Sequence, residues 1–264
     1  MSPTSSPRPD GAAWERDGWV LAVDALDAVT LDVVRQAADV LIEAQSADAG
    51  SGAPPGHRGV LHRSPVLAVI ARSASLRALV EPILGPRWRP VRGLLFDKTP
   101  AANWKVPWHQ DRVIAVRERR PAPGYRAWSR KEGVWHVQPP PEVPANMLAV
   151  RLHLDDCGPD SGPLRVLPGS HTAGYLDPDA IRAWRARVPE VTLCAPAGAA
   201  ILFRPLLLHA SAAALRPTHR RVLHLEYAAL PLPGGLEFAH LPGISESEFG
   251  DSTSASPPAG AAFW

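Results

Sequence analysis

The chain has 264 residues, of which 45% are hydrophobic and 20% charged, so it can bury the core of one large β-rich domain or two small ones; we favour one. Its 28 basic residues are scattered among 26 acidic ones and leave a formal net charge of +2, which excludes the basic stripe typical of nucleic-acid partners. No apolar run is long enough to cross a bilayer and the N-terminus lacks the apolar region of a signal peptide, so we expect a cytoplasmic protein with no membrane partner.

The two ends of the chain differ in composition from the middle. Residues 1–10 are rich in Ser and Pro and are expected to form a disordered tail, and residues 246–264 are expected to form an irregular one. Between them, residues 11–245 are predicted to fold as a single domain. The two cysteines, Cys157 and Cys194, are expected to be reduced thiols.

Helical patterns dominate the first third of the chain. The stretch Trp14–Leu21 reads as a short helix that is broken at Gly18 and continues as a strand. A long amphipathic helix is indicated after Thr30 by apolar residues at helical spacing: Leu31, Val34, Ala38, Leu41 and Ile42. A second one is predicted from an N-cap at Ser75 to Gly85, with Pro82 distorting its last turn. We expect both helices to buttress a sheet.

From Val91 onward the apolar pattern changes to a period of two. Val91–Lys98 reads as a strand, and the stretch around His109 opens another. The clearest strand is 147–155, whose even positions are apolar while Arg151, His153 and Asp155 share the other face, as in the wall of a pocket. Further short strands are expected at 162–171, 198–203, 206–209 and 221–228. Many short strands at close spacing predict a mainly β fold of the jelly-roll or barrel type, flanked by the N-terminal helices.

The chemistry centres on His109 and Asp111. On a strand, residues two apart point to the same side, so this imidazole and this carboxylate could bind one metal ion. Two histidines and one carboxylate, with open coordination positions, are typical of non-haem Fe(II) oxygenases. The sequence offers several candidates for the second imidazole: His136, His153, His171, His209, His219, His224 and His240. We prefer His209 because it ends the apolar run at 206–208 and should lie on a buried strand.

A basic pair, Arg220 and Arg221, follows His209 and Ser211. A keto acid that chelates iron through one end still needs its far carboxylate bound. An arginine does this with two parallel hydrogen bonds, and a hydroxyl such as that of Ser211 can add one more.

Together, these motifs resemble the phytanoyl-CoA dioxygenase family. The resemblance runs from about Trp14 to Leu230 and is carried by His109-x-Asp111, by Gly-Pro-Leu-Arg-Val-Leu-Pro-Gly-Ser-His at 162–171, and by His209-x-Ser211 with an arginine eleven positions after the histidine. It implies a double-stranded β-helix (cupin-like) core and a reaction that uses Fe(II), 2-oxoglutarate and O₂.

Position by position, the resemblance implies a role for several residues. His109, Asp111 and His209 would be the iron ligands, and Arg220 with Ser211 would hold the 2-oxoglutarate carboxylate, Arg221 being the alternative if the register is off by one. Lys98 would lie near the same site. Arg151 stands where many relatives carry a tryptophan, so it could contact substrate instead. In related halogenases the carboxylate residue is replaced, which makes room for a halide. Because Asp111 is intact, halogenation is not expected.

The segment 115–145 is predicted to be a lid over the substrate. It follows the metal motif as a long connection, and long loops in compact domains often bind ligands. Substrate contacts are expected from Arg117, Trp128 and Trp135 in this segment, and from Arg151, His153 and His224 on the strands.

The resulting hypothesis is an oxygenase that hydroxylates an unactivated C–H of a small molecule. Desaturation, epimerisation or cyclisation by the same machinery remains an alternative, as does a β-barrel binding protein that has lost turnover. A cupin-like metalloenzyme without 2-oxoglutarate is disfavoured because it would have no use for Arg220 and Ser211. The identity of the substrate and the oligomeric state are left open.

Overall fold

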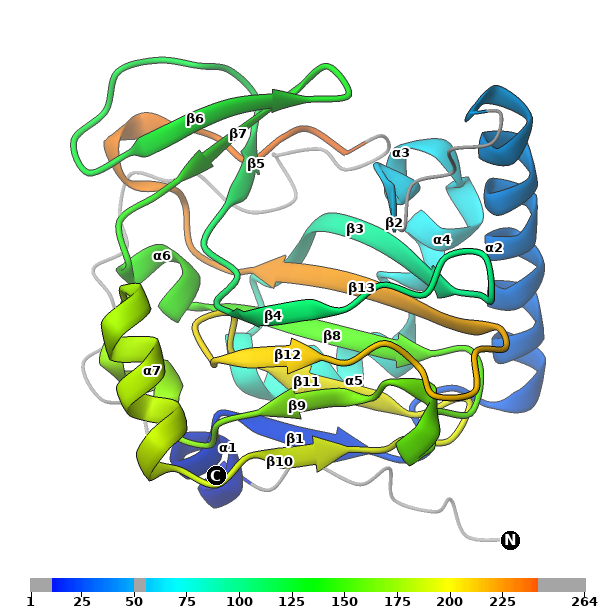
Figure 1. Ribbon diagram of the computed structural model, residues 1–264. Helices are drawn as coiled ribbons and strands as arrows, with labels where there is room; N and C mark the ends of the chain where they lie inside the picture. The colour runs from blue at the N-terminus through cyan, green and yellow to red at the C-terminus, as the bar shows by residue number, and fades with distance from the viewer. Residues whose placement is uncertain (1–10, 50–55, 242–264) are drawn as a thin grey trace, which may run out of the picture.

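Two antiparallel sheets face each other, and a third, smaller sheet lies above them in the computed structural model, which describes residues 11–49 and 56–241 (Figure 1). The expected tails at 1–10 and 246–264 lie outside the described residues. The mainly β fold with flanking helices agrees with the prediction. Among the described residues, no helix is long and apolar enough to cross a bilayer.

The large sheet has six strands in the order β1-β11-β8-β13-β3-β2 and is called the major sheet. Its strands are β1 (Trp19–Ala22), β11 (Ala200–Phe203), β8 (Met147–His153), β13 (Arg220–Ala228), β3 (Arg89–Lys98) and β2 (Gly56–Arg58). The minor sheet has the order β10-β9-β12-β4. Its strands are β10 (Val191–Leu193), β9 (Leu164–Val166), β12 (His209–Ser211) and β4 (Val106–His109).

The predicted lid segment contains a three-stranded sheet, called the lid sheet, which sequence reasoning treated only as a connection. Its order is β5-β7-β6, and the strands are β5 (Ile114–Val116), β7 (Val134–Gln138) and β6 (Arg126–Lys131). Phe238, near the end of the described chain, forms a β-bridge with Val116, and both belong to the small apolar core under the lid sheet.

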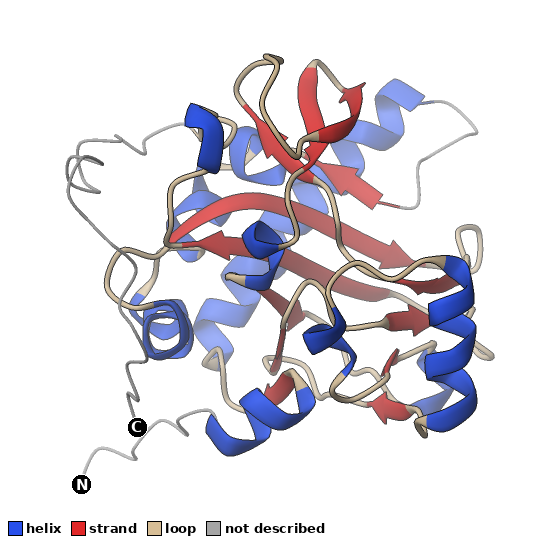
Figure 2. Cartoon of the chain, turned by 90° about the vertical axis from the view of Figure 1, so that its left-hand side faces the viewer, coloured by secondary structure: helices blue, strands red, loops and turns tan. Residues whose placement is uncertain are grey.

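Helices cover the outer face of the major sheet, and α7 lies apart from them on the opposite side (Figure 2). The α-helices are α1 (Gly11–Asp17), α2 (Ala28–Ala49), α3 (Val60–Arg63), α4 (Pro65–Ile70), α5 (Ala74–Leu84), α6 (Glu142–Ala145) and α7 (Pro178–Arg187). Short 3-10 turns occupy Pro159–Ser161, Ser170–Ala173 and Pro233–Gly235.

The apolar face of β8 joins the main hydrophobic core, as its alternating pattern predicts. Leu148, Val150 and Leu152 are fully buried against apolar residues of α2 and α5, such as Val34 and Leu76. The prediction that the two long helices buttress a sheet is therefore confirmed. The opposite face of the major sheet looks toward the minor sheet and carries the polar residues.

Three predicted boundaries are wrong. The strand predicted at 162–171 is shorter, because β9 covers only Leu164–Val166 and Ser170–Ala173 form a 3-10 turn. Helix α5 is capped by Ser73, whose hydroxyl accepts a hydrogen bond from the backbone N–H of Leu76, and not by Ser75. Strand β12 begins at His209, because Leu206–Leu208 form a buried turn rather than strand residues.

Candidate active site

The two candidate histidine ligands lie opposite each other on paired strands of the minor sheet. His209 of β12 pairs with His109 of β4, and their ring centroids are 4.1 Å apart. Each Nδ1 lies within hydrogen-bond distance of a backbone carbonyl, 2.9 Å from Pro107 O and 2.8 Å from Leu207 O. Because a carbonyl only accepts, Nδ1 carries the proton and Nε2 keeps its lone pair for a metal.

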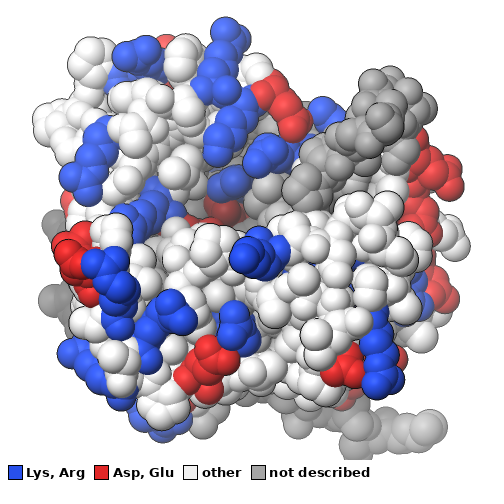
Figure 3. All heavy atoms as spheres, in the orientation of Figure 1, with Lys and Arg blue, Asp and Glu red and all other residues white. Residues whose placement is uncertain are grey.

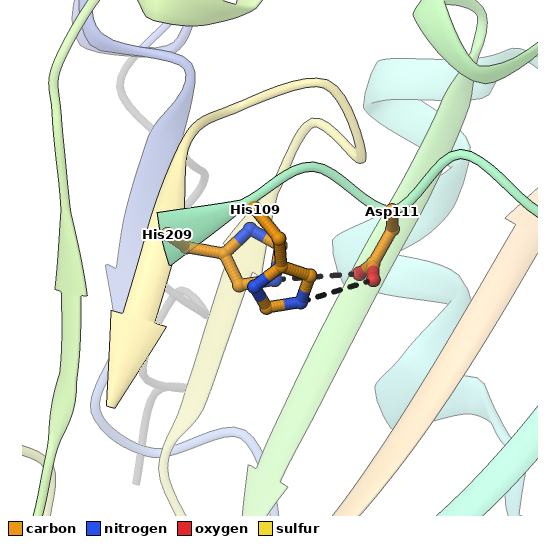
Figure 4. A group of neighbouring side chains, drawn as sticks. All are labelled: His109, Asp111 and His209. Carbon is orange, nitrogen blue, oxygen red and sulfur yellow. Dashed lines mark ion pairs between the residues drawn. The ribbon is translucent and has the colours of Figure 1, made fainter. Parts of the chain in front are cut away.

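Asp111 completes a cluster with these two rings (Figure 4). Its carboxylate oxygens lie 3.6 Å from Nε2 of His109 and 3.6 Å from Nε2 of His209, and the three ligand atoms lie within 4.8 Å of one another. Among the described residues, this is the group of His, Cys, Asp and Glu side chains arranged to hold a metal ion.

The loop after β4, rather than the strand itself, orients Asp111. Strand β4 ends at His109, and the backbone N–H of Asp111 donates to Pro205 O at 2.8 Å. The intervening Gln110 points away and is buried, with its amide nitrogen 2.8 Å from the carbonyl of Leu206. The alternation expected of a strand therefore persists for two residues beyond the strand's end.

Two of the three charge states suit a divalent cation. Burial alone would raise the pKa of Asp111, but the facing His209 and His109 outweigh it and hold this pKa well below its ordinary value. Burial and the neighbouring His109 lower the pKa of His209 to about 3. An ionised carboxylate and a neutral imidazole are the forms that bind a metal. The third differs: although burial lowers the pKa of His109, its hydrogen bond and charge interaction with Asp111 outweigh burial and raise this pKa, so metal binding would release a proton there.

Three buried cations, here called the basic end, lie beside this cluster. Arg220 of β13 pairs with Lys98 of β3, and Arg151 lies on the neighbouring strand β8. Lys98 is fully buried, and its Nζ donates to Ser211 Oγ at 3.3 Å and to the carbonyl of Ala212. Burial, Arg220 and Arg151 together lower the pKa of Lys98 to about 8.

Several guanidinium nitrogens of the basic end lack hydrogen-bond partners, although the guanidinium group of Arg151 lies over the ring of Phe96 at 5.5 Å. Nε and Nη1 of Arg220, which is 3% exposed, and Nε of Arg151 are buried without a hydrogen bond to any described residue. Burying unpaired cations costs several kcal/mol unless an anion compensates them. The basic end therefore fits the far carboxylate of a dicarboxylic acid whose other end lies at the metal.

Arg221 points to the other face of the major sheet. It forms ion pairs with Asp155, at 2.7 Å from Nη2, and with Asp39 of α2. These carboxylates, Asp155 first, raise its pKa above the ordinary arginine value despite partial burial. Of the two arginines that the sequence left open, Arg220 is the one on the side of the metal cluster.

The sequence profile of the phytanoyl-CoA dioxygenase family matches residues 14–222, most of the chain. The chain belongs to this family. It is accordingly an oxygenase whose cofactors are iron and 2-oxoglutarate, with O₂ as the oxidant, and the metal cluster and the basic end provide a place for each of the first two.

One relative in sequence and two solved structures illustrate the similarity. The L-proline trans-4-hydroxylase of Streptomyces griseoviridis is 25% identical over 248 residues, covering 80% of this chain and 82% of the relative. The carbocyclase SnoK from nogalamycin biosynthesis shares the fold with a TM-score of 0.67, at 15% identity, over 94% of this chain and 92% of its own. EctD from S. alaskensis, solved with 2-oxoglutarate and 5-hydroxyectoine, has a TM-score of 0.65 at 23% identity; the match covers 89% of this chain and 80% of the EctD chain.

His153 and His224 lie on the same face of the major sheet as the basic end. His153 is buried and neither ring nitrogen has a partner among the described residues; burial, with Arg151 next, lowers its pKa to about 3. His224 lies between the rings of Phe96 and Phe203, at 6.1 and 5.9 Å. Their contact with substrate stays a prediction, as does that of Arg151.

The structure does not bring the three predicted lid contacts to the metal cluster. Arg117 is exposed and pairs with Glu237 at 2.7 Å. Trp128 and Trp135 pack edge to face, with centroids 6.4 Å apart, against the apolar core under the lid sheet. Their predicted role therefore has no support from a contact here and stays a prediction.

Sequence reasoning missed two residues on the inner face of the major sheet, Arg92 and Glu226. Arg92 lies on the face of β3 that also carries Lys98, because the two residues are an even number of positions apart. In the same way, Glu226 shares a face of β13 with Arg220, Val222 and His224. The signal was therefore present in the alternation. It was overlooked because neither residue belongs to a motif.

Proposed function

We propose that this protein hydroxylates an unactivated C–H bond of a small molecule and releases succinate and CO₂ from 2-oxoglutarate. His109, Asp111 and His209 hold the iron, and Arg220, Ser211 and Lys98 hold the far carboxylate of 2-oxoglutarate. The observation that carries the proposal is the placement of an open metal cluster beside buried, unpartnered arginine nitrogens.

When bound, iron and 2-oxoglutarate supply the chemistry that activates O₂ and oxidises the substrate. The contribution of the chain is positional. The carbonyls of Pro107 and Leu207 fix both imidazole tautomers, and the basic end sets the direction of the co-substrate. Three protein ligands leave coordination positions free for the keto acid and O₂. Phe203 lies beside His209 at 5.0 Å and helps to bury that ligand, whereas the side chains of His109 and Asp111 are 37% and 27% exposed, so the cluster is accessible on their side.

Hydroxylation is proposed in preference to other outcomes because a curated relative over most of the chain is a hydroxylase. The similarity to a carbocyclase supports cyclisation as the alternative among related oxidations. A catalytically silent binding protein would not need to keep three correctly oriented ligands, and Asp111 in particular is ionised and free to bind a cation.

The test is an anaerobic titration of the metal-free protein with Fe(II) and 2-oxoglutarate. We expect the weak visible charge-transfer band of a chelated keto acid in the wild type, and we expect Asp111→Ala to lose both this band and iron-dependent succinate formation. Asp179→Ala, an exposed acidic residue on α7, is the matched control and should keep both. An unchanged band in Asp111→Ala, or no band in wild type with iron bound, would contradict the proposal.

A further inference from the structure

The inner face of β13 continues well beyond the metal cluster. Along this strand, Arg220, Val222, His224 and Glu226 point to the same side. From Arg220 to Glu226 the strand spans roughly 20 Å, far more than a five-carbon dicarboxylic acid occupies. His224, in the middle, is close enough to Asp111 to affect its pKa. The stretch beyond His224 therefore lies outside the length that a bound five-carbon dicarboxylic acid needs.

Glu226 lies at the far end of this face with half of its hydrogen-bonding capacity unused. The residue is 4% exposed, and its Oε1 accepts a hydrogen bond from Arg92 Nη1 at 3.1 Å and lies 3.5 Å from His224 Nε2. Its Oε2 accepts no hydrogen bond from any described residue. An ionised carboxylate is an acceptor only, and a buried one is stable when donors surround both oxygens. Glu226 is thus placed to accept from a group on the ligand.

Cations surround the same end of the pocket. Arg58 pairs across the sheet with Leu94, which places it on the inner face, and its buried Nε has no partner among the described residues. Lys131 comes from the lid sheet. Although the residue as a whole is exposed, partial burial, then Arg58 and Arg92, lower the pKa of its ammonium group.

Existing ion pairs leave part of this positive charge uncompensated. Glu226 pairs with Arg92, and Glu132 lies 3.1 Å from Arg63 but 4.0 Å from Arg58. Within the described part of the chain, Lys131 forms no ion pair. Figure 3 shows basic side chains gathered around a hollow beneath the lid sheet, with an acidic side chain at its back.

We propose that this end of the pocket binds a small zwitterion, a free amino acid or a close derivative. Its ammonium group donates to Oε2 of Glu226, and its carboxylate lies against Lys131 and Arg58. The inference rests on the proposed function for what happens to the bound molecule, but the charge pattern is independent of it. A simple anion would leave Oε2 of Glu226 without a donor, and a simple cation would face the positive charges of Arg58 and Lys131.

The binding test uses the metal-free protein without 2-oxoglutarate, so that it does not depend on catalysis. Free L-amino acids are tested one by one by calorimetry, and each ligand that binds is compared with its N-acetyl derivative and its carboxamide. We expect the free form to bind and both blocked forms to bind about tenfold more weakly or worse, as for loss of a charged hydrogen bond. If no free amino acid binds, or if the blocked forms bind equally well, the proposal is overturned.

Two variants assign the two charges. Lys131→Gln should weaken binding of the free amino acid about tenfold but leave the affinity for its carboxamide unchanged. Glu226→Gln should also weaken binding of the free amino acid but leave the affinity for its N-acetyl derivative unchanged. Because Glu226→Gln removes the partner of Arg92 and can destabilise the fold, the lid variant Lys131→Gln is decisive. If it binds the free amino acid as tightly as wild type does, the proposed carboxylate site is wrong.

Two variants outside the proposed carboxylate and ammonium contacts serve as controls. Arg130 is the neighbour of Lys131, but its side chain lies over Trp135; Glu190 pairs with Arg165. The variants Arg130→Gln and Glu190→Gln should both bind the amino acid like wild type. Amino-acid binding without a charge-transfer band would sink the proposed function and leave this inference standing. A charge-transfer band without amino-acid binding would overturn this inference and leave the proposed function standing.

Discussion

At the scale of single residues, the adjacent Arg220 and Arg221 show how one step along a strand separates two roles. Successive side chains of β13 point to opposite faces of the major sheet. Arg220 therefore joins Lys98 and Arg151 at the basic end, while Arg221 reaches Asp155 and Asp39 on the helical side. We therefore assign ligand binding to the first, as proposed above, and a stabilising role to the second.

This separation predicts opposite phenotypes for two neighbouring variants. Arg220→Ala should raise the 2-oxoglutarate concentration needed for half-maximal succinate formation by tenfold or more, with the unfolding free energy unchanged or increased, because an unpaired buried charge is removed. Arg221→Ala should cost about 2 kcal/mol of stability and leave the 2-oxoglutarate requirement unchanged. Denaturant titration and co-substrate kinetics measure both. If only Arg221→Ala changes the requirement, the assigned register is wrong.

At the scale of elements, Gly18 separates helix α1 from strand β1. It adopts φ +79°, and a Cβ placed there would lie 2.3 Å from Nδ1 of His171. Its carbonyl accepts a hydrogen bond from Arg204 N at 2.9 Å. The break that composition predicted at this position thus has two causes, a backbone conformation that favours glycine and a close approach of the Ser170–Ala173 turn.

Gly18→Ala should destabilise the protein by about 2–4 kcal/mol, since it combines a left-handed backbone with a clash against His171. Gly59→Ala is a matched control: its φ is +62°, but a Cβ would meet nothing within 4 Å, so only the backbone cost of about 1 kcal/mol is expected. The comparison is made by urea unfolding at constant pH. Equal losses in the two variants would show that the His171 contact contributes nothing.

At the scale of the whole molecule, the site exists only where the two sheets meet. The minor sheet and the loop that follows β4 supply His109, Asp111 and His209, whereas the major sheet supplies Lys98 and Arg220. A ligand set that spans both sheets binds the folded chain and not the unfolded one. Binding must therefore stabilise the complete fold.

Iron and 2-oxoglutarate added together under anaerobic conditions should raise the unfolding temperature. When the ligand concentration is a hundred times the dissociation constant, the free energy of unfolding rises by about 2.7 kcal/mol. For a chain of this size this corresponds to an increase of roughly 5–10 °C in the unfolding temperature. Differential scanning calorimetry checks this. Asp111→Ala should lose the gain from iron, and a similar gain in that variant would place the metal elsewhere.

The sequence by itself determined what depends on local period and side-chain chemistry. The alternation of β8 and the helical spacing in α2 were enough to predict a mainly β fold with flanking helices. The order of His109, Asp111, His209 and Ser211 helps to carry the resemblance that implied the family and its cofactors. These features are readable because strands and helices have fixed periods, and because few residue types bind iron or a carboxylate.

Only the tertiary structure decided which residues meet. The placement of Arg220 and Arg221 on opposite faces and the pairing of Glu226 with Arg92 depend on the register among β3, β8 and β13, which are far apart in the chain. A shift of one residue in that register would turn every side chain to the other face while leaving the local pattern equally favourable. Burial against α2 on one side and the minor sheet on the other selects the register.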